Sequence, residues 1–256
     1  MKAYPNVKIN LGLSILRKRP DGYHDIETLF VPYYGLRDEL EIEVCDGPGD
    51  RIILEGGGWD PQSDLSMKAV KLLRRDFDFP PVEVRLRKHA PAGAGLGGGS
   101  SDAAFALRML NDMFSLGLGD VSLAAYAAEL GSDCPFFIYN RPMTGEGRGE
   151  ILSDYALDLE GWRIEVRIPE GVHVSTRDAY SRVVPRDREP GGRMPLREAL
   201  ALPVERWREV LVNDFEPSVF ALWPQVGDEK RRFYEEGAVY ASMSGSGSSV
   251  FGIFRK

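Results

Sequence analysis

Apolar and polar residues alternate along several segments of the chain, and this alternation predicts β-strands. Between residues 7 and 15 every second side chain is Val, Ile or Leu, and the residues between them are polar or small, as in a strand with one buried face. Similar short patterns predict strands over 25–30, 40–44, 51–54, 82–87, 162–168, 238–243 and 249–254. Short turns separate 40–44 from 51–54 and 238–243 from 249–254, so we expect each of these two pairs to be neighbours in a sheet.

Apolar residues three and four positions apart predict helices over 63–77 and 121–130. After Ser101, small and apolar residues recur on one face of a further predicted helix: Ala103, Leu107, Leu110 and Phe114. Ser175 or Thr176 is the expected N-cap of another helix. Pro and Gly between residues 186 and 194 predict a mobile surface loop.

The composition places the chain among ordinary globular proteins. Its 256 residues suffice for one large domain or two small ones, and 43% are hydrophobic and 28% charged. The net charge of −7 and the lack of a basic tract argue against nucleic acid or an anionic membrane as a partner. Without a signal peptide or a long apolar run, we expect a cytoplasmic protein, in which Cys45 and Cys134 are reduced and no Cys/His metal cluster forms.

A glycine-rich segment lies between the predicted strand 82–87 and the helix after Ser101. Five glycines fall between residues 93 and 99, where a backbone without side chains lets a ligand approach closely. Free amide groups and the dipole at the start of the following helix favour an anion. The segment therefore predicts a phosphate site rather than a turn without a ligand, because clustered glycines are entropically costly to order.

Other phosphate-binding motifs fit this segment less well. Gly93, Gly95 and Gly98 spell G-x-G-x-x-G, but a dinucleotide-binding fold needs a strand after the helix, and a second helical pattern follows here. The sequence has no G-x-x-x-x-G-K-[ST] segment, which excludes a P-loop. It also has no H-R-D or D-F-G, which argues against a protein kinase.

The glycine segment resembles P-x-x-x-G-L-G-S/G-S-S, the second motif of the GHMP kinases. The members of this family are ATP-dependent kinases of small molecules. The resemblance implies an ATP-binding loop made of Pro91, Ala92, Gly93, Ala94, Gly95, Leu96, Gly97, Gly98, Gly99, Ser100 and Ser101. It also implies Mg²⁺ as a second cofactor, with ligands left unknown and Ser101 as a candidate ligand.

Residues 8–13, K-I-N-L-G-L, resemble the first motif of the same family. Lys8 and Asn10 lie on one side of the predicted strand, and by alternation alone this side fits an ordinary solvated face. The resemblance implies that Lys8 is a catalytic residue and that Asn10 binds the substrate beside it.

An aspartate, Asp133, stands at what we expect to be a helix-to-strand junction. Acids are common turn formers, so this residue alone indicates no chemistry. Residues 131–137, G-S-D-C-P-F-F, resemble a family signature, and the resemblance implies that Asp133 is the catalytic base. Cys134 beside it fits a small packing residue.

Two further segments resemble one branch of the family, R-x-D-G-Y-H-x-(I/L)-x-T-x-F and V-S-T-x-x-A-Y. That branch phosphorylates the 2-hydroxyl of 4-diphosphocytidyl-2-C-methyl-D-erythritol in non-mevalonate isoprenoid precursor biosynthesis. The resemblance implies that Tyr23 and Tyr180 stack on the cytosine, that His24 hydrogen-bonds its edge, and that Thr176 also binds the substrate. By themselves, Tyr23 and His24 fit a packed loop, and Tyr180 fits a helix core.

Residues 244–248, S-G-S-G-S, fit a simple glycine hairpin between two predicted strands. They also resemble the third family motif, M-S-G-S/T-G. The resemblance implies that the backbone amides of Gly245, Ser246 and Gly247 lie near the transferring phosphate. Residues 213–216, N-D-F-E, match a further family segment, for which we expect a packing role at a helix terminus and no chemistry.

The resemblance extends from residue 7 to residue 254 and implies the α+β, two-domain GHMP kinase fold. A ribosomal-protein-like N-terminal domain over 1–150 would bind ATP, and a ferredoxin-like C-terminal domain over 151–256 would bind the substrate. The charged glycine segment 145–150 fits a domain boundary. In the implied reaction Asp133 accepts the hydroxyl proton, while Lys8 keeps Asp133 ionised and favours the developing alkoxide. We expect the protein to be a monomer or a homodimer.

Two other functions compete with this interpretation. The first is a GHMP kinase acting on mevalonate or homoserine. These substrates contain no base on which an aromatic ring could stack, so the D-G-Y-H and S-T-x-x-A-Y segments argue against it. A nucleotide-binding protein without activity on the same fold is disfavoured because both Lys8 and Asp133 are present.

Overall fold

The computed structural model describes residues 1–56, 58–185 and 193–256. Positions 186–192 of the surface loop expected over 186–194 therefore lie outside the described residues. The chain divides into two compact units, and both are assembled from separate segments. The first unit holds residues 1–8, 32–92 and 97–141, and the second holds residues 9–31, 93–96 and 142–256. The single domain division at residue 150 stays a prediction.

The first unit contains a four-stranded sheet in the order β1-β4-β6-β5. The strands are β1 (Lys2–Ala3), β4 (Glu39–Val44), β5 (Arg51–Glu55) and β6 (Val82–Arg87). Strand β6 pairs antiparallel with β4 and parallel with β5, so Val84 lies opposite Ile42 on one side and Ile52 on the other. The expected direct pairing of 40–44 with 51–54 is therefore wrong. A helical crossover after β5 brings β6 between them, and the crossover helix supplies apolar contacts that a bare hairpin lacks.

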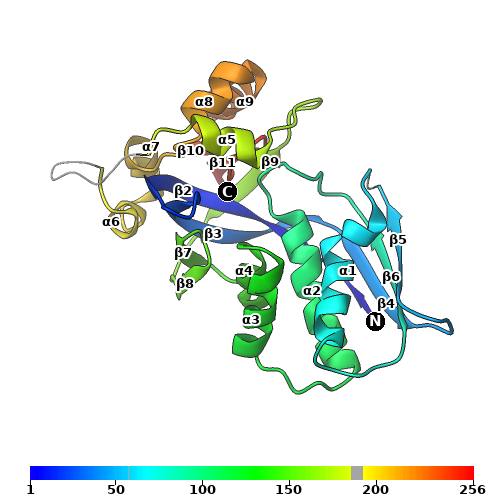
Figure 1. Cartoon of the computed structure of the whole chain (residues 1–256). Coiled ribbons are helices and arrows are strands. Elements are labelled where there is room, and N and C mark those ends of the chain that lie inside the picture. The colour runs from blue at the N-terminus through cyan, green and yellow to red at the C-terminus, as the bar shows by residue number, and fades with distance from the viewer. Residues whose placement is uncertain (57, 186–192) are drawn as a thin grey trace. The chain divides into compact units, whose positions relative to one another are not determined.

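The helical elements of this unit are η1 (Pro61–Ser63), α1 (Leu65–Arg74), α2 (Gly98–Met113), α3 (Asp120–Leu130) and α4 (Cys134–Tyr139). Helices α1 and α2 pack on each other, and α2 packs on β4 (Figure 1). Helix α1 begins after Asp64, whose carboxylate accepts a hydrogen bond of 2.8 Å from the amide of Ser66. Residues 134–138, expected as a strand after Asp133, form α4. Pro135 suits the first turn of a helix, and an apolar run this short has no informative period.

The second unit contains two sheets. One has the order β2-β3-β7-β8 and consists of β2 (Asn6–Lys18), β3 (His24–Arg37), β7 (Met143–Gly147) and β8 (Ile151–Asp154), of which β2 and β3 also extend into the first unit. The other has the order β10-β11-β9 and consists of β9 (Trp162–Arg167), β10 (Tyr240–Met243) and β11 (Val250–Arg255). The expected pairing of the last two predicted strands is confirmed, with Ser242 opposite Phe251.

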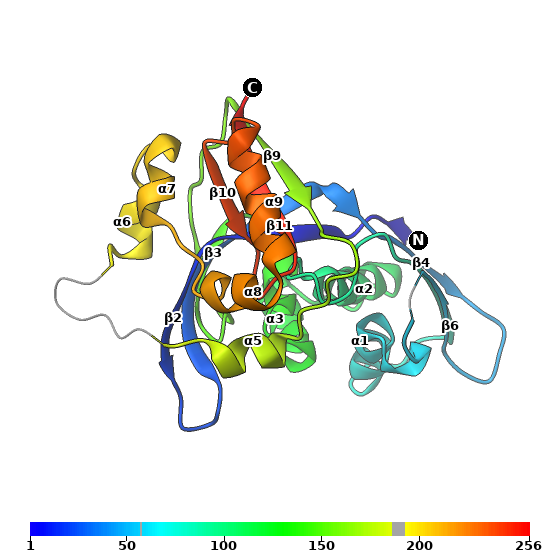
Figure 2. The ribbon, with the colours of Figure 1, turned by 90° about the horizontal axis from the view of Figure 1, so that it is seen from above.

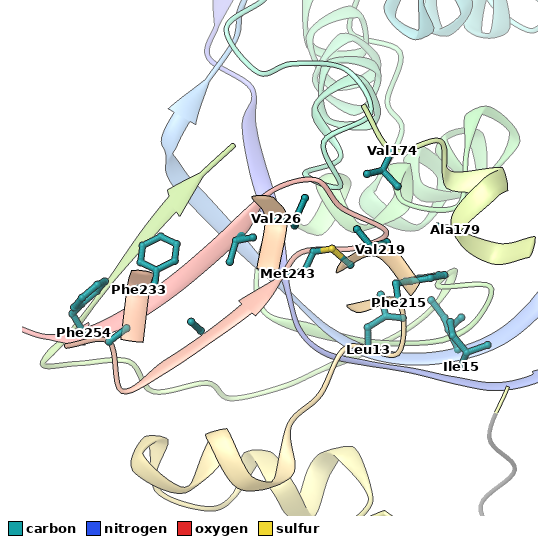
Figure 3. Packing of buried hydrophobic residues seen from close by; sticks show 14 residues of the cluster. Leu13, Ile15, Val174, Ala179, Phe215, Val219, Val226, Phe233, Met243 and Phe254 are labelled. Atoms are coloured by element: carbon teal, nitrogen blue, oxygen red, sulfur yellow. The ribbon is translucent and has the colours of Figure 1, made fainter. Parts of the chain in front are cut away.

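Helical elements of the second unit are α5 (Thr176–Arg182), α6 (Leu196–Leu200), η2 (Val204–Arg206), α7 (Trp207–Val210), α8 (Glu216–Leu222) and α9 (Pro224–Glu235). Helix α9 lies along β10 and β11 (Figure 2). Buried side chains from β2, α5, α8, α9, β10 and β11 form one apolar core (Figure 3). Phe215 and Val219 of the α8 region lie within it, so the segment before α8 is held rigidly from one side.

The mixed helices and strands confirm the expected α+β class. None of the helices in the described part of the chain has the length and apolar character that a membrane span requires.

Candidate functional site

The start of helix α2 offers amide groups to a ligand. Its N-cap, Gly97, has a φ of 70° and provides no side chain to bond the first-turn amides. The amides at the start of an α-helix have no intrahelical acceptor, so they and the helix dipole attract an anion. A Cβ atom at Gly97 would lie 3.2 Å from Cε of Lys8. The absent side chain therefore lets the Lys8 ammonium group approach the same helix start.

Lys8 and Asp133, both in the first unit, form an ion pair with 3.3 Å between Nζ and Oδ2. The lysine side chain is only 4% exposed, whereas that of Asp133 is 33% exposed. Strand β2 carries the lysine, and Asp133 immediately precedes α4. A buried cation beside a reachable carboxylate can stabilise a negatively charged oxygen that forms next to it.

Cys134 lies next to this pair but is chemically quiet. Burial raises the pKa of its thiol to about 12, and the charge of Asp133 acts in the same direction. A thiol with such a pKa stays protonated, because only the thiolate is a strong nucleophile. The Cys134 side chain is fully buried, which confirms its packing role.

A buried charge cluster joins the two ends of the phosphate loop, the glycine-rich segment 91–101 that we expect to bind phosphate. The Lys88 amine bonds the carboxylates of Asp38 and Asp102, and all three side chains are at most 4% exposed. The second oxygen of Asp38 accepts hydrogen bonds from the amides of His89 (2.6 Å) and Ala90 (2.8 Å). Lys88 precedes the loop and Asp102 follows it in α2, so the ion pair joins the loop's two ends.

This cluster binds one proton more readily than isolated carboxylates do. One cation faces two carboxylates, so full ionisation would leave a net buried negative charge. Burial accordingly raises the pKa of Asp102 to about 8, although the Lys88 charge opposes the rise. The second oxygen of Asp102 has no hydrogen-bond partner among the described residues.

In the second unit, two glycine loops pack backbone against backbone. A Cβ atom at Gly95 would lie 2.1 Å from the carbonyl oxygen of Ser244, and one at Gly245 would lie 2.9 Å from the carbonyl oxygen of Gly95. Ser244 Oγ donates to the carbonyl of Gly95 (3.0 Å), and Ser249 Oγ donates to that of Ala94 (2.6 Å). Residues 93–96 of the second motif and residues 244–249 of the third are therefore one rigid group, which only glycine permits at positions 95 and 245.

Asn10 lies beneath this group and is almost fully buried. Its Nδ2 donates to Thr28 Oγ1 (3.0 Å), and its Oδ1 accepts from Ser244 Oγ (3.4 Å). Thr28 Oγ1 in turn donates to the carbonyl of Gly12 (2.5 Å). In this structure Asn10 supports the third motif, and a contact with substrate stays a prediction.

Aromatic residues gather elsewhere in the second unit. The rings of His24 and Tyr180 stack with centroids 5.0 Å apart, and Phe215 meets Tyr180 edge-on at 4.8 Å. Tyr23 is 55% exposed and lies against Arg148, whose guanidinium carbon is 5.0 Å from the ring centroid. His24 thus stacks on Tyr180 in this structure, and a base between Tyr23 and Tyr180 stays a prediction.

His24 is suited to read the edge of a base. Burial, with a smaller contribution from the charge of Lys18, lowers the pKa of the His24 imidazole from 6.5, so the ring is neutral at pH 7. A neutral imidazole has one donor and one acceptor nitrogen. Thr176, which begins α5 after the N-cap Ser175, lies with Oγ1 3.2 Å from Oγ of Ser246. Thr176 therefore adjoins the third glycine motif.

Each unit thus gathers a different set of the predicted site residues. The first holds Lys8, Asp133, Pro91, Ala92 and residues 97–101. The second holds residues 93–96, Asn10, Tyr23, His24, Thr176, Tyr180 and residues 245–247.

Sequence reasoning missed the cluster of Lys88, Asp38 and Asp102. No motif joins these three residues, because their proximity depends on how β4, β6 and α2 pack. For residues 213–216, which match a further family segment, the sequence predicted only a packing role.

Side chains for a metal are sparse. Among the described residues, no group of three or more His, Cys, Asp or Glu is placed to hold a metal ion. Ser101 Oγ has no hydrogen-bond partner among the described residues, but the residue is fully buried in α2. Its role as a Mg²⁺ ligand stays a prediction.

Sequence profiles of two protein families match the chain. The GHMP kinases N terminal domain matches residues 64–141, and the GHMP kinases C terminal domain matches residues 196–256. The first range contains the start of α2 and Asp133, and the second contains the third glycine motif.

Similar proteins extend over nearly the whole chain. A 4-diphosphocytidyl-2-C-methyl-D-erythritol kinase of Bacteroides thetaiotaomicron is 49% identical over 258 residues, which cover 99% of this chain and 92% of that protein. The protein of the same name from Porphyromonas gingivalis is 45% identical over 262 residues, with coverage of 100% and 93%.

Solved structures share the fold. The crystal structure of a 4-(cytidine 5'-diphospho)-2C-methyl-D-erythritol kinase superposes with a TM-score of 0.81 at 33% identity, covering 98% of this chain and 89% of that one. A homoserine kinase from Cytophaga hutchinsonii has a TM-score of 0.67 at 19% identity, with coverage of 98% and 86%. At that identity the likeness concerns the fold alone.

Proposed function

The chain belongs to the GHMP kinase family, and on this premise we propose that it phosphorylates the 2-hydroxyl of 4-diphosphocytidyl-2-C-methyl-D-erythritol with ATP. The products are ADP and the 2-phosphate, an intermediate of non-mevalonate isoprenoid precursor biosynthesis. The observation that carries the chemical part of this proposal is the Lys8–Asp133 ion pair beside the glycine-capped start of α2.

The reaction requires a base, a cation and an anion site. Asp133 orients the substrate hydroxyl and accepts its proton while the hydroxyl oxygen bonds to the γ-phosphorus of ATP. The bond from that phosphorus to the bridging oxygen breaks, and ADP leaves with the electron pair. Lys8 keeps Asp133 ionised and stabilises negative charge on the attacking oxygen. Amides at the start of α2 bind phosphate oxygens.

Recognition of the cytidyl group belongs to the second unit. A cytosine needs a flat partner for its face and a donor and acceptor for its edge. Tyr180 and Tyr23 supply aromatic faces, neutral His24 supplies both hydrogen-bonding functions, and Thr176 supplies a hydroxyl.

The remaining expectations follow from the family. ATP is the phosphate donor of GHMP kinases, and Mg²⁺ neutralises the phosphate charge when bound, with nucleotide oxygens as its main ligands. We expect a cytoplasmic enzyme acting on a small molecule, as a monomer or a homodimer, without nucleic acid or membrane as a partner.

The proposal is tested by ADP release from purified protein with ATP and Mg²⁺. Four alcohols are compared: 4-diphosphocytidyl-2-C-methyl-D-erythritol, mevalonate, homoserine and galactose. We expect turnover with the cytidyl compound alone. Turnover with another alcohol would keep the kinase chemistry and remove the role of the aromatic residues. ATP binding without turnover of any alcohol would favour a nucleotide-binding protein without activity.

A further inference from the structure

The third glycine motif contains amide groups that lack acceptors. Within the loop, Ser244 donates to the carbonyl of Ser249 (2.9 Å), and Gly247 donates to that of Ser244 (3.0 Å). The amides of Gly245, Ser246 and Ser248 find no acceptor in the described part of the chain, although these residues are buried. A buried donor without an acceptor is unfavourable by about 1–3 kcal/mol, so such a cluster indicates that a ligand supplies the acceptor.

A buried asparagine holds this loop from its opposite side. Asn213 is 2% exposed, and its Nδ2 donates to two carbonyls of the loop, those of Met243 and Gly245, both at 2.8 Å. Its Oδ1 accepts the amide of Phe215 at 3.0 Å, which fixes the orientation of the side-chain amide. Both donors and one of the two acceptor lone pairs of the Asn213 side-chain amide are thus engaged.

The geometry of a peptide bond carries this restraint to the unpaired amides. In a trans peptide the C=O and the following N–H point in opposite directions, and the Gly245–Ser246 bond is trans. Because Asn213 holds the Gly245 carbonyl, the Ser246 N–H must point away from Asn213. Gly245, with a φ of 56°, has little resistance of its own to rotation of this peptide, so the asparagine sets its direction.

The segment that carries Asn213 is itself anchored. Backbone hydrogen bonds join Leu13 of β2 to Val212 (2.8 Å) and Asp214 to Leu13 (2.9 Å). Glu216 accepts the amide of Met243 at 2.9 Å, and its other oxygen pairs with Lys230. Asn213 therefore stands on a rigid support on β2, close to the loop that it restrains.

We propose that Asn213 is a positioning residue for phosphoryl transfer, which aims the Ser246 amide at an oxygen of the transferring phosphoryl group. The inference rests on the proposed function and assigns a role to a residue for which the sequence motif indicated only packing. Because the amide direction is set before the phosphate binds, the donor needs no reorganisation during the reaction.

Asn213→Asp tests this role, because it replaces the donating NH₂ by an oxygen of similar size that repels both carbonyls. We expect kcat to fall by about 10²–10³, the usual effect of losing one such donor, with little change in KM for the cytidyl substrate. The matched control is Asp214→Asn, which weakens bonds to the Ile15 amide and to Arg193 but leaves the loop untouched. It should lower the melting temperature without lowering kcat.

Nucleotide binding gives a readout that does not depend on turnover. The probes are ADP and a non-hydrolysable ATP analogue, with affinities measured by calorimetry. In Asn213→Asp the preference for the analogue over ADP should fall by about tenfold, as for one lost hydrogen bond to a charged group. The control variant should keep the wild-type preference. If Asn213→Asp does not fold, Asn213→Ala tests the same expectation without the repulsion.

An unchanged kcat in the Asn213 variant, or an equal loss of kcat in both variants, would overturn the role of Asn213. So would an unchanged preference for the analogue over ADP in the folded Asn213 variant. Failure of the wild-type protein to use the cytidyl substrate would instead count against the proposed function, while the nucleotide affinities would still test Asn213.

Discussion

The two compact units differ in the kind of group that they offer to a ligand. The first unit offers a charged pair, Lys8 and Asp133, next to the start of a long helix. The second offers aromatic rings and backbone amides of glycine loops. Charges, helix dipoles and fixed amides act on groups whose charge changes during a reaction, whereas aromatic rings recognise the shape of a group and hold it in place.

This difference teaches which kinetic constant the charged pair of the first unit and the aromatic group of the second unit should each control. Variants in the charged pair should lower kcat, because the pair acts on the reacting oxygen. Variants in the aromatic group should raise KM for the cytidyl substrate and spare kcat, because that group is far from the reacting atoms along the substrate.

Among Lys8→Met, Tyr180→Ala and Asp102→Asn, the lysine variant should have the largest effect on activity. The substitution keeps most of the side-chain volume in a buried position but removes the charge beside Asp133, so kcat should fall by about 10²–10³. Steady-state ADP release measures this loss. The control is Lys2→Met, which removes an exposed lysine that pairs with Glu39 in the same unit and should leave kcat unchanged. Equal kcat values in the two variants would contradict a catalytic role of Lys8.

Tyr180→Ala should have an intermediate effect and a different signature. Loss of one stacked aromatic ring is worth about 1–3 kcal/mol, so KM for the cytidyl substrate should rise about 5–150-fold while KM for ATP stays constant. Tyr180→Phe keeps the ring and should resemble the wild type. A fall in kcat with constant KM would instead show that Tyr180 acts on the reacting atoms, as the charged pair does. It would contradict the distinction drawn between the aromatic group and the charged pair.

Asp102→Asn should have the smallest effect on activity and a clear effect on the pH dependence of stability. Because the pKa of Asp102 is raised to about 8, the folded protein holds a proton that the unfolded chain releases near pH 4. The stabilisation linked to this proton is complete below pH 4 and is lost as the pH rises towards 8. Asparagine removes the titration, so the melting temperature of the variant should fall less than that of the wild type between pH 5 and 8.

Thermal unfolding at several pH values measures this difference. The isosteric asparagine can still accept the Lys88 hydrogen bond, so the phosphate loop should keep its closure. Parallel curves for the two proteins would show that another group binds the extra proton.

Much of the fold and the main chemical residues could be predicted from the sequence. Most predicted strands and helices are confirmed, because local alternation and capping residues such as Ser175 report directly on local structure. Lys8 and Asp133, 125 positions apart in the sequence, do form the expected pair. Their proximity was available from the family resemblance and not from any local pattern.

What could not be predicted depends on packing between distant segments. The insertion of β6 between β4 and β5 follows from a helical crossover, which no residue in either strand encodes. The apolar run 134–138 had no period that separates a helix from a strand. No local pattern marks Lys88 and Asp102 as partners, because their ion pair forms only where α2 packs on β4. The stack of His24 on Tyr180 likewise depends on the position of α5.

The most direct test of the central claim is the single-turnover rate of Asp133→Asn with ATP and the cytidyl substrate both saturating. The variant keeps the shape of the side chain and leaves Lys8 in place, so nucleotide and substrate should still bind. The account predicts a rate lower by about 10²–10⁴, as expected when a general base is lost. A single-turnover rate close to that of the wild type would show that Asp133 does not accept the proton and would contradict the assignment of chemistry to the first unit.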